Sequence, residues 1–234
     1  MTRLIPRAIG CSRFSNAYLY RLIMYRIDLH THSIISYDGG IGDVQYRDLL
    51  SQKYCIAVTD HNEISKAVEL RAKFGEQIIV GEEILTLDGE IVGLFLTSKI
   101  EPGLDLMETV KRIKAQGGLT YVPHPFELAR KGLSERSLFE ITDLVDVVEV
   151  FNARLRGRGP AARAEKFASE RGITKAAASD AHGIRGVGWA YCEAGQLPTR
   201  ENLQELLRSA KLIKRRAPWL SYLDPLRNKL KKRF

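Results

Sequence analysis

All five histidines of this 234-residue chain lie in four short clusters, most of which also contain acidic residues. Imidazole and carboxylate groups together are the ligands that Zn, Mn and Fe prefer in proteins. A solitary histidine is usually an ordinary core or surface residue, but that explanation does not readily cover all five. The pattern therefore predicts a metal site with more than one ion. The histidines are His30, His32, His61, His124 and His182.

A short apolar run precedes each cluster, and such runs followed by turn residues are typical of buried strands. Helical periodicity and capping residues predict helices in between. The predicted strands cover 25–29, 54–58, 77–80, 90–95, 119–122, 145–150 and 173–178, the fourth forming a hairpin with the third across Asp88-Gly89. The predicted helices cover 43–53, 65–74, 105–116 and 160–171.

Strands that alternate with helices indicate an α/β fold with a mainly parallel sheet. Reactive residues at the carboxyl ends of several strands indicate that this sheet closes into a barrel, because these ends then meet on one face. About seven strands are expected, fewer than the eight of the common (β/α) barrel. The metal site is therefore predicted at the carboxyl ends of the strands, although its residues span more than 150 positions.

The ordered set of motifs resembles the PHP (polymerase and histidinol phosphatase) superfamily of metal-dependent phosphoesterases, from about Arg26 to Glu193. The resemblance implies a distorted seven-stranded (β/α) barrel with two or three divalent ions, which would be Mn, Fe or Zn. Ions held a few ångströms apart bind a phosphate between them and lower the pKa of a bound water. The activity implied is hydrolysis of phosphate esters.

Carried over by motif, the resemblance assigns metal ligands to all five histidines and to four carboxylates. Glu83 is similar to the carboxylate that bridges two ions, and a catalytic water is expected on the metal held by His30, His32, Glu83 and Asp180. A second ion is expected near Asp38, His61 and His182, and a third near Glu90 and His124. The assigned ligands are His30, His32, Asp38, His61, Glu83, Glu90, His124, Asp180 and His182.

Two positions depart from the family pattern. Glu90 stands where close phosphoesterase relatives often carry a histidine, and a carboxylate there adds negative charge and favours harder ions. The segment Ser36-Tyr37-Asp38 is one residue longer than the usual Ser-Asp-Gly form.

Further residues are expected to support this site. Asp28 and Asp60 are predicted to orient ligands rather than bind metal, because ligating histidines usually donate to a neighbouring carboxylate. Glu149 and Asn152 end a predicted strand, where a place in the pocket and a structural role are equally compatible with the sequence.

Cationic side chains that follow the fourth and fifth motifs are candidates for holding the substrate phosphate. Arginine presents the bidentate fork that a phosphate prefers. Arg154 is the first candidate because it lies nearest a strand end, and Arg130 is the second. Lys131, Arg156 and Arg158 are further candidates in the same segments.

The composition fits one barrel-sized domain, predicted over 24–207, with an extension of doubtful role over 1–23 and a basic helix and tail over 208–234. The three cysteines, Cys11, Cys55 and Cys192, have no paired spacing and indicate reduced thiols in a cytoplasmic protein. No apolar run reaches the length of a transmembrane helix.

The net charge of +8 is concentrated at the two ends of the chain. Residues 208–234 hold ten Lys or Arg against Asp224 alone, a net charge of +9, and residues 1–26 hold five Arg and no acid, a net charge of +5. The stretch 27–207 is therefore acidic, at −6. The basic C-terminal segment, with a helix predicted from Arg200 to about Arg216, is either solvated charge or a contact surface for nucleic acid or an anionic membrane.

The leading hypothesis is a phosphoesterase that acts on a phosphorylated small molecule or short nucleic acid, either as a nucleotide phosphatase or as a 5′–3′ oligonucleotide exonuclease. A histidinol-phosphatase-like enzyme and a non-catalytic metal-binding module are alternatives, although a degenerate module would be expected to have lost ligands. A metal-dependent amidohydrolase is a further alternative, and the absence of a lysine at a suitable strand end argues against it.

Overall fold

The computed structural model of the protein describes residues 24–155 and 157–233. The predicted N-terminal extension over 1–23, together with Cys11 and Arg156, lies outside the described residues. Cys55 and Cys192 are buried and form no disulfide.

The described residues form a nine-stranded sheet in the order β7-β6-β5-β4-β3-β2-β1-β8-β9. All seven predicted strands are present, but the expected number is wrong, because β8 and β9 extend the sheet beyond β1. The strands are β1 (Tyr25–Thr31), β2 (Tyr54–Val58), β3 (Ile78–Leu85), β4 (Glu90–Leu94), β5 (Leu119–Val122), β6 (Val147–Asn152), β7 (Thr174–Ala178), β8 (Ala190–Ala194) and β9 (Lys211–Lys214).

The sheet is mixed rather than mainly parallel. Four of its pairings are parallel, and four are antiparallel. The predicted hairpin of β3 and β4 introduces two of the antiparallel pairings, and β8 and β9 introduce the others. The direction of β4 matters for the site, because an antiparallel strand brings its first residue, not its last, to the edge where the parallel strands end.

The two sides of the sheet approach each other beyond β1 and β7. A parallel bridge joins Thr31 to Ala181, and the backbone N–H of His32 donates to the carbonyl oxygen of Ala181 over 2.9 Å. The sheet is therefore a nearly closed barrel, as expected, and residues that follow β1 and β7 become neighbours.

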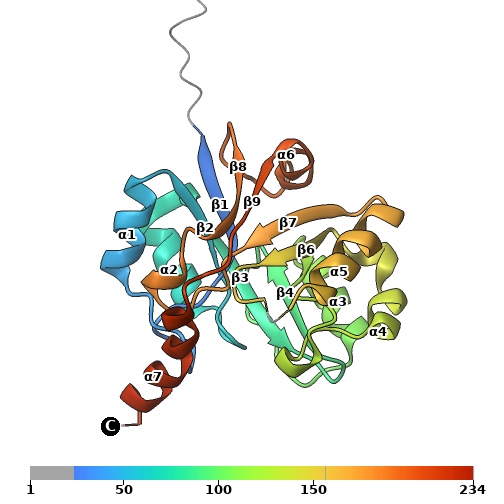
Figure 1. Cartoon of the computed structure of the whole chain (residues 1–234), viewed down its shortest axis with the longest axis horizontal. Coiled ribbons are helices and arrows are strands. Elements are labelled where there is room, and N and C mark those ends of the chain that lie inside the picture. The colour runs from blue at the N-terminus through green and yellow to red at the C-terminus, as the bar shows by residue number, and fades with distance from the viewer. Residues whose placement is uncertain (1–23, 156, 234) are drawn as a thin grey trace, which may run out of the picture.

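Helices flank the sheet on both sides (Figure 1), with α1 and α2 on one side and α3, α4 and α5 on the other. Strand side chains alternate between faces, so that Ile27 and Leu29 join a core with Leu203 and Leu207. The helices are α1 (Asp43–Ser51), α2 (Ser65–Phe74), α3 (Leu106–Ala115), α4 (Glu135–Glu140), α5 (Gly159–Glu170), α6 (Leu203–Ser209) and α7 (Asp224–Lys231).

The helix predicted from Arg200 to about Arg216 is wrong beyond Ser209. Its first part is α6, which buries Leu203 and Leu207 as expected. The chain then forms β9, whose Ile213 pairs with Tyr191 of β8. Antiparallel pairing with β8 provides hydrogen-bond partners for the backbone N–H and C=O groups of this segment, so it forms a strand in spite of its helical periodicity. Among the described residues, no helix is both long and apolar enough to span a membrane.

The basic segment 208–234 is therefore not a single helix followed by a tail. It contributes a strand to the sheet, a short 3₁₀ helix at Trp219–Leu223 and then α7. Figure 1 shows α7 at the end of the molecule opposite the start of β1.

Candidate metal centre

The nine predicted metal ligands converge at one edge of the sheet. His30 is the next-to-last residue of β1, and His32 follows that strand directly. Glu83 lies within β3. Glu90 is the first residue of β4, and because β4 is antiparallel to both neighbours this residue reaches the same edge. The remaining ligands follow the ends of β2, β5 and β7 or lie in the loop after β1, namely His61, His124, Asp180, His182 and Asp38.

The carboxylate of Glu83 lies at the centre of this cluster. Its Oε2 is 3.3 Å from His30 Nε2, 3.4 Å from His32 Nε2 and 3.1 Å from His61 Nδ1. Its Oε1 is 3.1 Å from His124 Nε2. A buried carboxylate surrounded by four imidazoles is the arrangement that a bridging ligand requires.

Two further carboxylates, those of Asp180 and Asp38, both lie beside the fifth imidazole, His182, and each also lies near an imidazole that faces Glu83. Asp180 Oδ1 lies 3.4 Å from both His32 Nε2 and His182 Nδ1. Asp38 lies 3.4 Å from His182 Nε2 and 3.7 Å from His61 Nε2. The cluster therefore contains several sets of potential ligands that share histidines, rather than one isolated set.

Glu90 completes the acidic part of the cluster. Its carboxylate lies 3.8 Å from His61 Nδ1 and 3.9 Å from His124 Nε2. Burial, and then the negative charge of Glu83, raise the pKa of Glu90 to about 8. A second carboxylate so close to Glu83 is costly to ionise without a cation nearby, and divalent ions would supply that positive charge.

The residues present fit divalent metal ions. His30 Nε2, both ring nitrogens of His32, Glu83 Oε2 and His124 Nδ1 are buried and have no hydrogen-bond partner within the described part of the chain. Buried polar atoms without partners are rare in native proteins and require an explanation. Four groups of three residues place their ligand atoms within 4.8 Å of one another, namely His32-His61-His182, His30-Glu83-His124, His30-His32-Asp180 and His61-Glu83-Glu90.

Glu149, whose role the sequence left open, is a residue of β6, and its carboxylate lies beside the candidate ligands His30 and His124. Its Oε2 is 3.1 Å from His30 Nδ1 and accepts a hydrogen bond of 2.5 Å from the hydroxyl of Tyr121. Its Oε1 accepts from the backbone N–H of His124 and from Asn152 Nδ2. Burial alone would raise the pKa of Glu149, but the hydrogen bond with His30 and that residue's charge lower it overall. An acidic residue near the end of a mostly apolar strand was the signal available in the sequence.

Asp28 and Asp60 are both buried beside the cluster. Asp28 accepts hydrogen bonds from the backbone N–H groups of Ser179, over 3.0 Å, and His30. Asp60 accepts from the backbone N–H and the hydroxyl of Ser33, over 2.6 and 2.5 Å. Asp60 therefore fixes the backbone that follows His32. The hydrogen bonds of its carboxylate go to Ser33 and not to the ring of His61.

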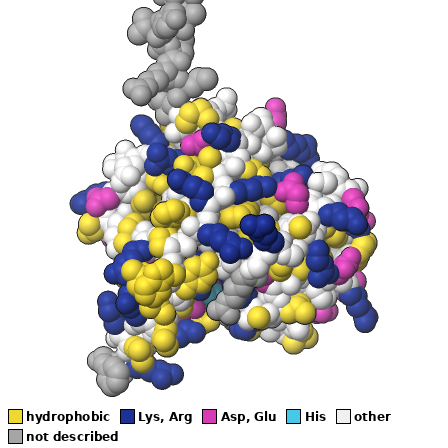
Figure 2. Space-filling model, in the orientation of Figure 1, with side chains coloured by type: hydrophobic (Ala, Val, Ile, Leu, Met, Phe, Trp, Pro, Cys, Tyr) yellow, Lys and Arg dark blue, Asp and Glu magenta, His cyan; other side chains and the backbone are white. Residues whose placement is uncertain are grey.

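The cluster opens into a cavity of about 260 Å³ whose wall carries four cations. Arg130 and Arg154, predicted from the sequence, both form ion pairs with Asp180, and Arg154 Nη1 lies 2.9 Å from His182 Nδ1. Lys131 also lines the cavity, as does Lys229 from α7, which the sequence did not single out. Only a small area of histidine is visible on the face that Figure 2 draws, in keeping with the burial of the cluster.

Arg158 is not among the residues that line this cavity. It occupies the N-cap position of α5, where its side chain makes no capping hydrogen bond.

Two of the candidate ligands have a backbone conformation that side chains rarely adopt. The φ angles are 27° at His124 and 52° at Asp180. Such conformations persist where the surrounding structure enforces them, and they concentrate at functional sites. Here they turn both side chains into the cluster.

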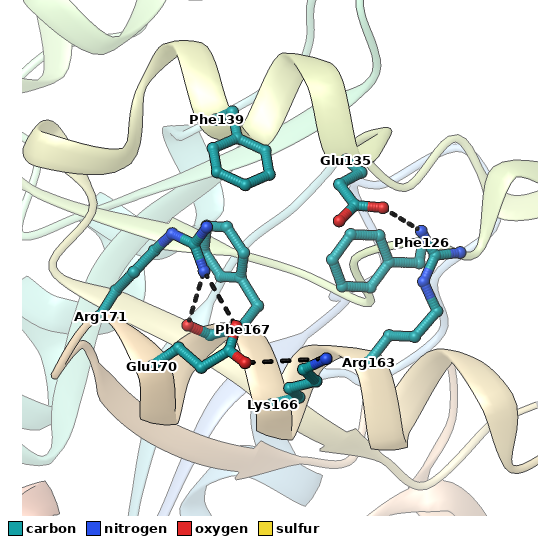
Figure 3. A pocket seen from close by; sticks show the side chains of 8 residues that line it. All are labelled: Phe126, Glu135, Phe139, Arg163, Lys166, Phe167, Glu170 and Arg171. Atoms are coloured by element: carbon teal, nitrogen blue, oxygen red, sulfur yellow. Dashed lines mark hydrogen bonds and ion pairs between the residues drawn. The ribbon is translucent and has the colours of Figure 1, made fainter.

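A second cavity, of about 190 Å³, lies between α4 and α5 (Figure 3) and has a different character. Arg163 stacks on the ring of Phe126 and is paired with Glu135 over 2.9 Å. Arg171 and Lys166 are likewise paired with Glu170 (Figure 3). The cations of this cavity are paired with neighbouring glutamates, and no histidine lines it, so it is not the candidate active site.

Comparisons with known proteins identify a matching family model and similar proteins. Residues 160–212, which run from α5 to β9, match the model of a PHP-associated family. The chain is 39% identical over 182 residues to the uncharacterized protein MJ0417 of Methanocaldococcus jannaschii, covering 74% of this chain and 71% of that protein. It is also 38% identical over 143 residues to the uncharacterized protein MJ1587 of the same organism, covering 55% of this chain and 82% of that protein.

The fold resembles a crystal structure from Bacteroides vulgatus, a two-domain protein containing a predicted PHP-like metal-dependent phosphoesterase. The TM-score is 0.64 at 18% identity, over 89% of this chain and 70% of that one. With the predicted order of motifs, the nearly closed barrel and the convergent histidines and carboxylates, the chain belongs to the PHP-like metal-dependent phosphoesterase family.

Proposed function

We propose that the protein hydrolyses phosphate esters with divalent ions held by the nine clustered ligands, and that its substrate is a nucleotide or another small phosphorylated molecule. The observation that carries this proposal is the arrangement around Glu83, where four imidazoles face one buried carboxylate. The cations of the cavity wall lie beside these ligands, as an anionic substrate requires.

Bound divalent ions would supply an activated water and offset the charge of the phosphate. The residues of the chain would do the rest. Glu83 and Asp180 hold the imidazoles in place around one centre, and the hydrogen bond between Glu149 and His30 Nδ1 keeps Nε2 of that ring directed at Glu83. This support reduces the rearrangement needed when the ions and substrate bind.

The two arginines of the cavity are suited to the phosphate oxygens. Arg154 Nε is a buried donor with no hydrogen-bond partner in the part of the chain that the structure describes. A guanidinium with a free donor accommodates an oxyanion bidentately. Arg130, which pairs with the other carboxylate oxygen of Asp180, would neutralise a second oxygen of the phosphate.

A second candidate function is exonuclease action on short oligonucleotides. The observation that favours it is a groove of about 520 Å³ lined by Tyr37, Lys229, Lys232 and Arg233, which shares Tyr37 and Lys229 with the metal cavity. An aromatic ring beside cations is suited to a further nucleotide of a single strand.

Phosphate release by purified protein tests the proposal. The protein is stripped of metal, reloaded with Mn and supplied with mononucleotides, bisphosphonucleotides, histidinol phosphate and short RNA. Release that requires metal and disappears in His30→Ala supports the proposal, and the preferred substrate distinguishes the phosphatase from the exonuclease. Arg163→Ala, in the cavity between α4 and α5, is the matched control and is expected to retain activity. Release that survives both metal removal and His30→Ala would overturn the proposal.

A further inference from the structure

The C-terminal helix α7 is attached to the metal cluster through one side chain. Asn228 Nδ2 donates hydrogen bonds to the carbonyl oxygen of Asp38, over 2.9 Å, and to that of His182, over 2.7 Å. The two acceptors belong to different segments, the loop that follows β1 and the segment that follows β7. A primary amide has two N–H groups, so a single Asn228 side chain can satisfy both carbonyls at once.

Both segments carry a glycine where α7 approaches them. A Cβ atom added to Gly40 would lie 2.6 Å from Asn228 Nδ2, and one added to Gly183 would lie 2.7 Å from Asp224 Oδ2 at the start of α7. These distances are too short for any other residue without displacement of the Asn228 amide or the Asp224 carboxylate. Gly40 and Gly183 follow Asp38 and His182 closely in the sequence, and they allow α7 to pack directly on the backbone of the ligand segments.

Further contacts hold α7 in this position. Lys232 Nζ donates to the carbonyl oxygens of Ser36 and of Gly39, the latter over 2.8 Å. Ahead of the helix, the backbone N–H of Ala217 and the hydroxyl of Tyr222 both donate to the carbonyl oxygen of Ala153, beside the end of β6. The segment 217–232 therefore runs along the ligand-bearing edge of the barrel rather than away from it.

We propose that Asn228 is a positioning residue for metal, which sets the distance between Asp38 and His182 by holding the backbone of both. Their side chains meet at 3.4 Å between Asp38 Oδ2 and His182 Nε2, with His61 Nε2 3.7 Å from Asp38. The inference rests on the metal-holding part of the proposed function. It assigns α7 to the ion position expected near Asp38, His61 and His182, because the two hydrogen bonds of the Asn228 amide go to the backbone of Asp38 and His182 and not to that of His30, His32 or Asp180.

Metal binding by Asn228 variants of the full chain tests this inference without reference to activity. Calorimetric titration with Mn, with elemental analysis after gel filtration, gives the number and affinity of the sites. Asn228→Ala is expected to weaken one class of site by about 10–100-fold, the effect usual for residues that hold ligands in place. Asn228→Asp is expected to weaken it more, because a carboxylate would face two carbonyl oxygens. Lys231→Ala, an exposed residue of the same helix, is the matched control and is expected to bind like the wild type.

A double-mutant cycle with Gly40 separates positioning from a general loss of stability. Gly40→Ala alone is expected to weaken the same site, because the new Cβ displaces the Asn228 amide. In the Asn228→Ala background the same substitution is expected to cost much less, since the colliding amide is gone, so that the two effects are not additive. Circular dichroism of each variant confirms that the barrel is folded.

The outcomes separate this inference from the proposed function. A wild-type protein that binds no divalent ion contradicts both. A wild type that binds ions, with Asn228→Ala and Asn228→Asp binding them equally well, overturns the positioning role alone. Uniform weakening of all sites together with loss of folded structure in the Asn228 variants also overturns it, because α7 would then support the fold and not one ion position.

Discussion

The Nδ1 atom of His30 lies 3.1 Å from Oε2 of Glu149, although the two residues are 119 positions apart. This contact fixes one side of the ring, so that Nε2 is directed at Oε2 of Glu83, 3.3 Å away. A carboxylate that accepts from a ligating histidine sets both the orientation of the ring and the nitrogen that is free to bind metal.

Replacement of Glu149 by glutamine is therefore expected to weaken metal binding although the amide is nearly the same size. The expected loss is about 10–100-fold in metal affinity, with a similar loss of phosphate release at limiting Mn. Glu165→Gln, which alters a surface ion pair with Lys175 and Lys214, is the control. Equal metal affinity in Glu149→Gln and the wild type would show that the contact with His30 does not orient the ring.

Removal of a ligand should have a larger effect than removal of a supporting carboxylate. His30→Ala and Asp180→Ala are each expected to abolish phosphate release while the barrel remains folded, because both face the centre of the cluster. Asp60→Asn is expected to retain some activity, with a loss of about 10–100-fold, since Asp60 acts through Ser33. Activity and circular dichroism are measured together, and total loss in all three variants would mean that Asp60 has a more direct role.

The geometry of the phosphate-binding arginine should matter as well as its charge. Arg154→Lys keeps the positive charge but cannot bind bidentately, so kcat/KM is expected to fall about tenfold or more, equivalent to about 1.4 kcal/mol. Arg163→Lys makes the same exchange in the cavity of Figure 3 and serves as the control. Steady-state kinetics on the best substrate measures both, and an unchanged kcat/KM for Arg154→Lys would exclude Arg154 from the phosphate site.

The exposed cations of α7 provide a test of nucleic-acid binding that leaves the metal cluster intact. Truncation after Ala217 is not such a test, because it removes Asn228 as well as the basic charge and is expected to lower activity on every substrate. The double variant Arg227→Gln with Lys231→Gln is suitable instead, because it removes charge from exposed positions only. If these residues contact oligonucleotides, binding should weaken and its log–log salt slope should flatten by about 0.7 for each lost contact with a single strand.

Mononucleotide hydrolysis by the Arg227 and Lys231 double variant is the accompanying control and is expected to match that of the wild type. An unchanged oligonucleotide affinity and salt slope would mean that these basic residues are solvated charge.

Much of the site could be predicted because its chemistry is attached to local patterns. Each histidine follows an apolar strand, and an Asp-Gly turn marks the β3–β4 hairpin that brings Glu90 to the right edge. The strand β9 could not be predicted in the same way. Its four residues, Lys211–Lys214, lie in a stretch with helical periodicity, and only pairing with β8 makes them a strand.

The contacts of Glu149 and Asn228 depend on residues distant in the sequence. An acid in a strand has a recognisable pattern, but its partner His30 does not follow from that pattern. The glycines at positions 40 and 183 were visible beside the ligands, yet their use as a packing surface for α7 depends on how the C-terminal segment returns across the barrel.

The measurement that tests the central claim most directly is metal content and phosphate release on the same preparation, purified without chelator. Two to three divalent ions per chain are expected, with release lost when they are removed and restored when Mn is added back. A folded protein that contains no metal and still releases phosphate at the full rate would contradict the account.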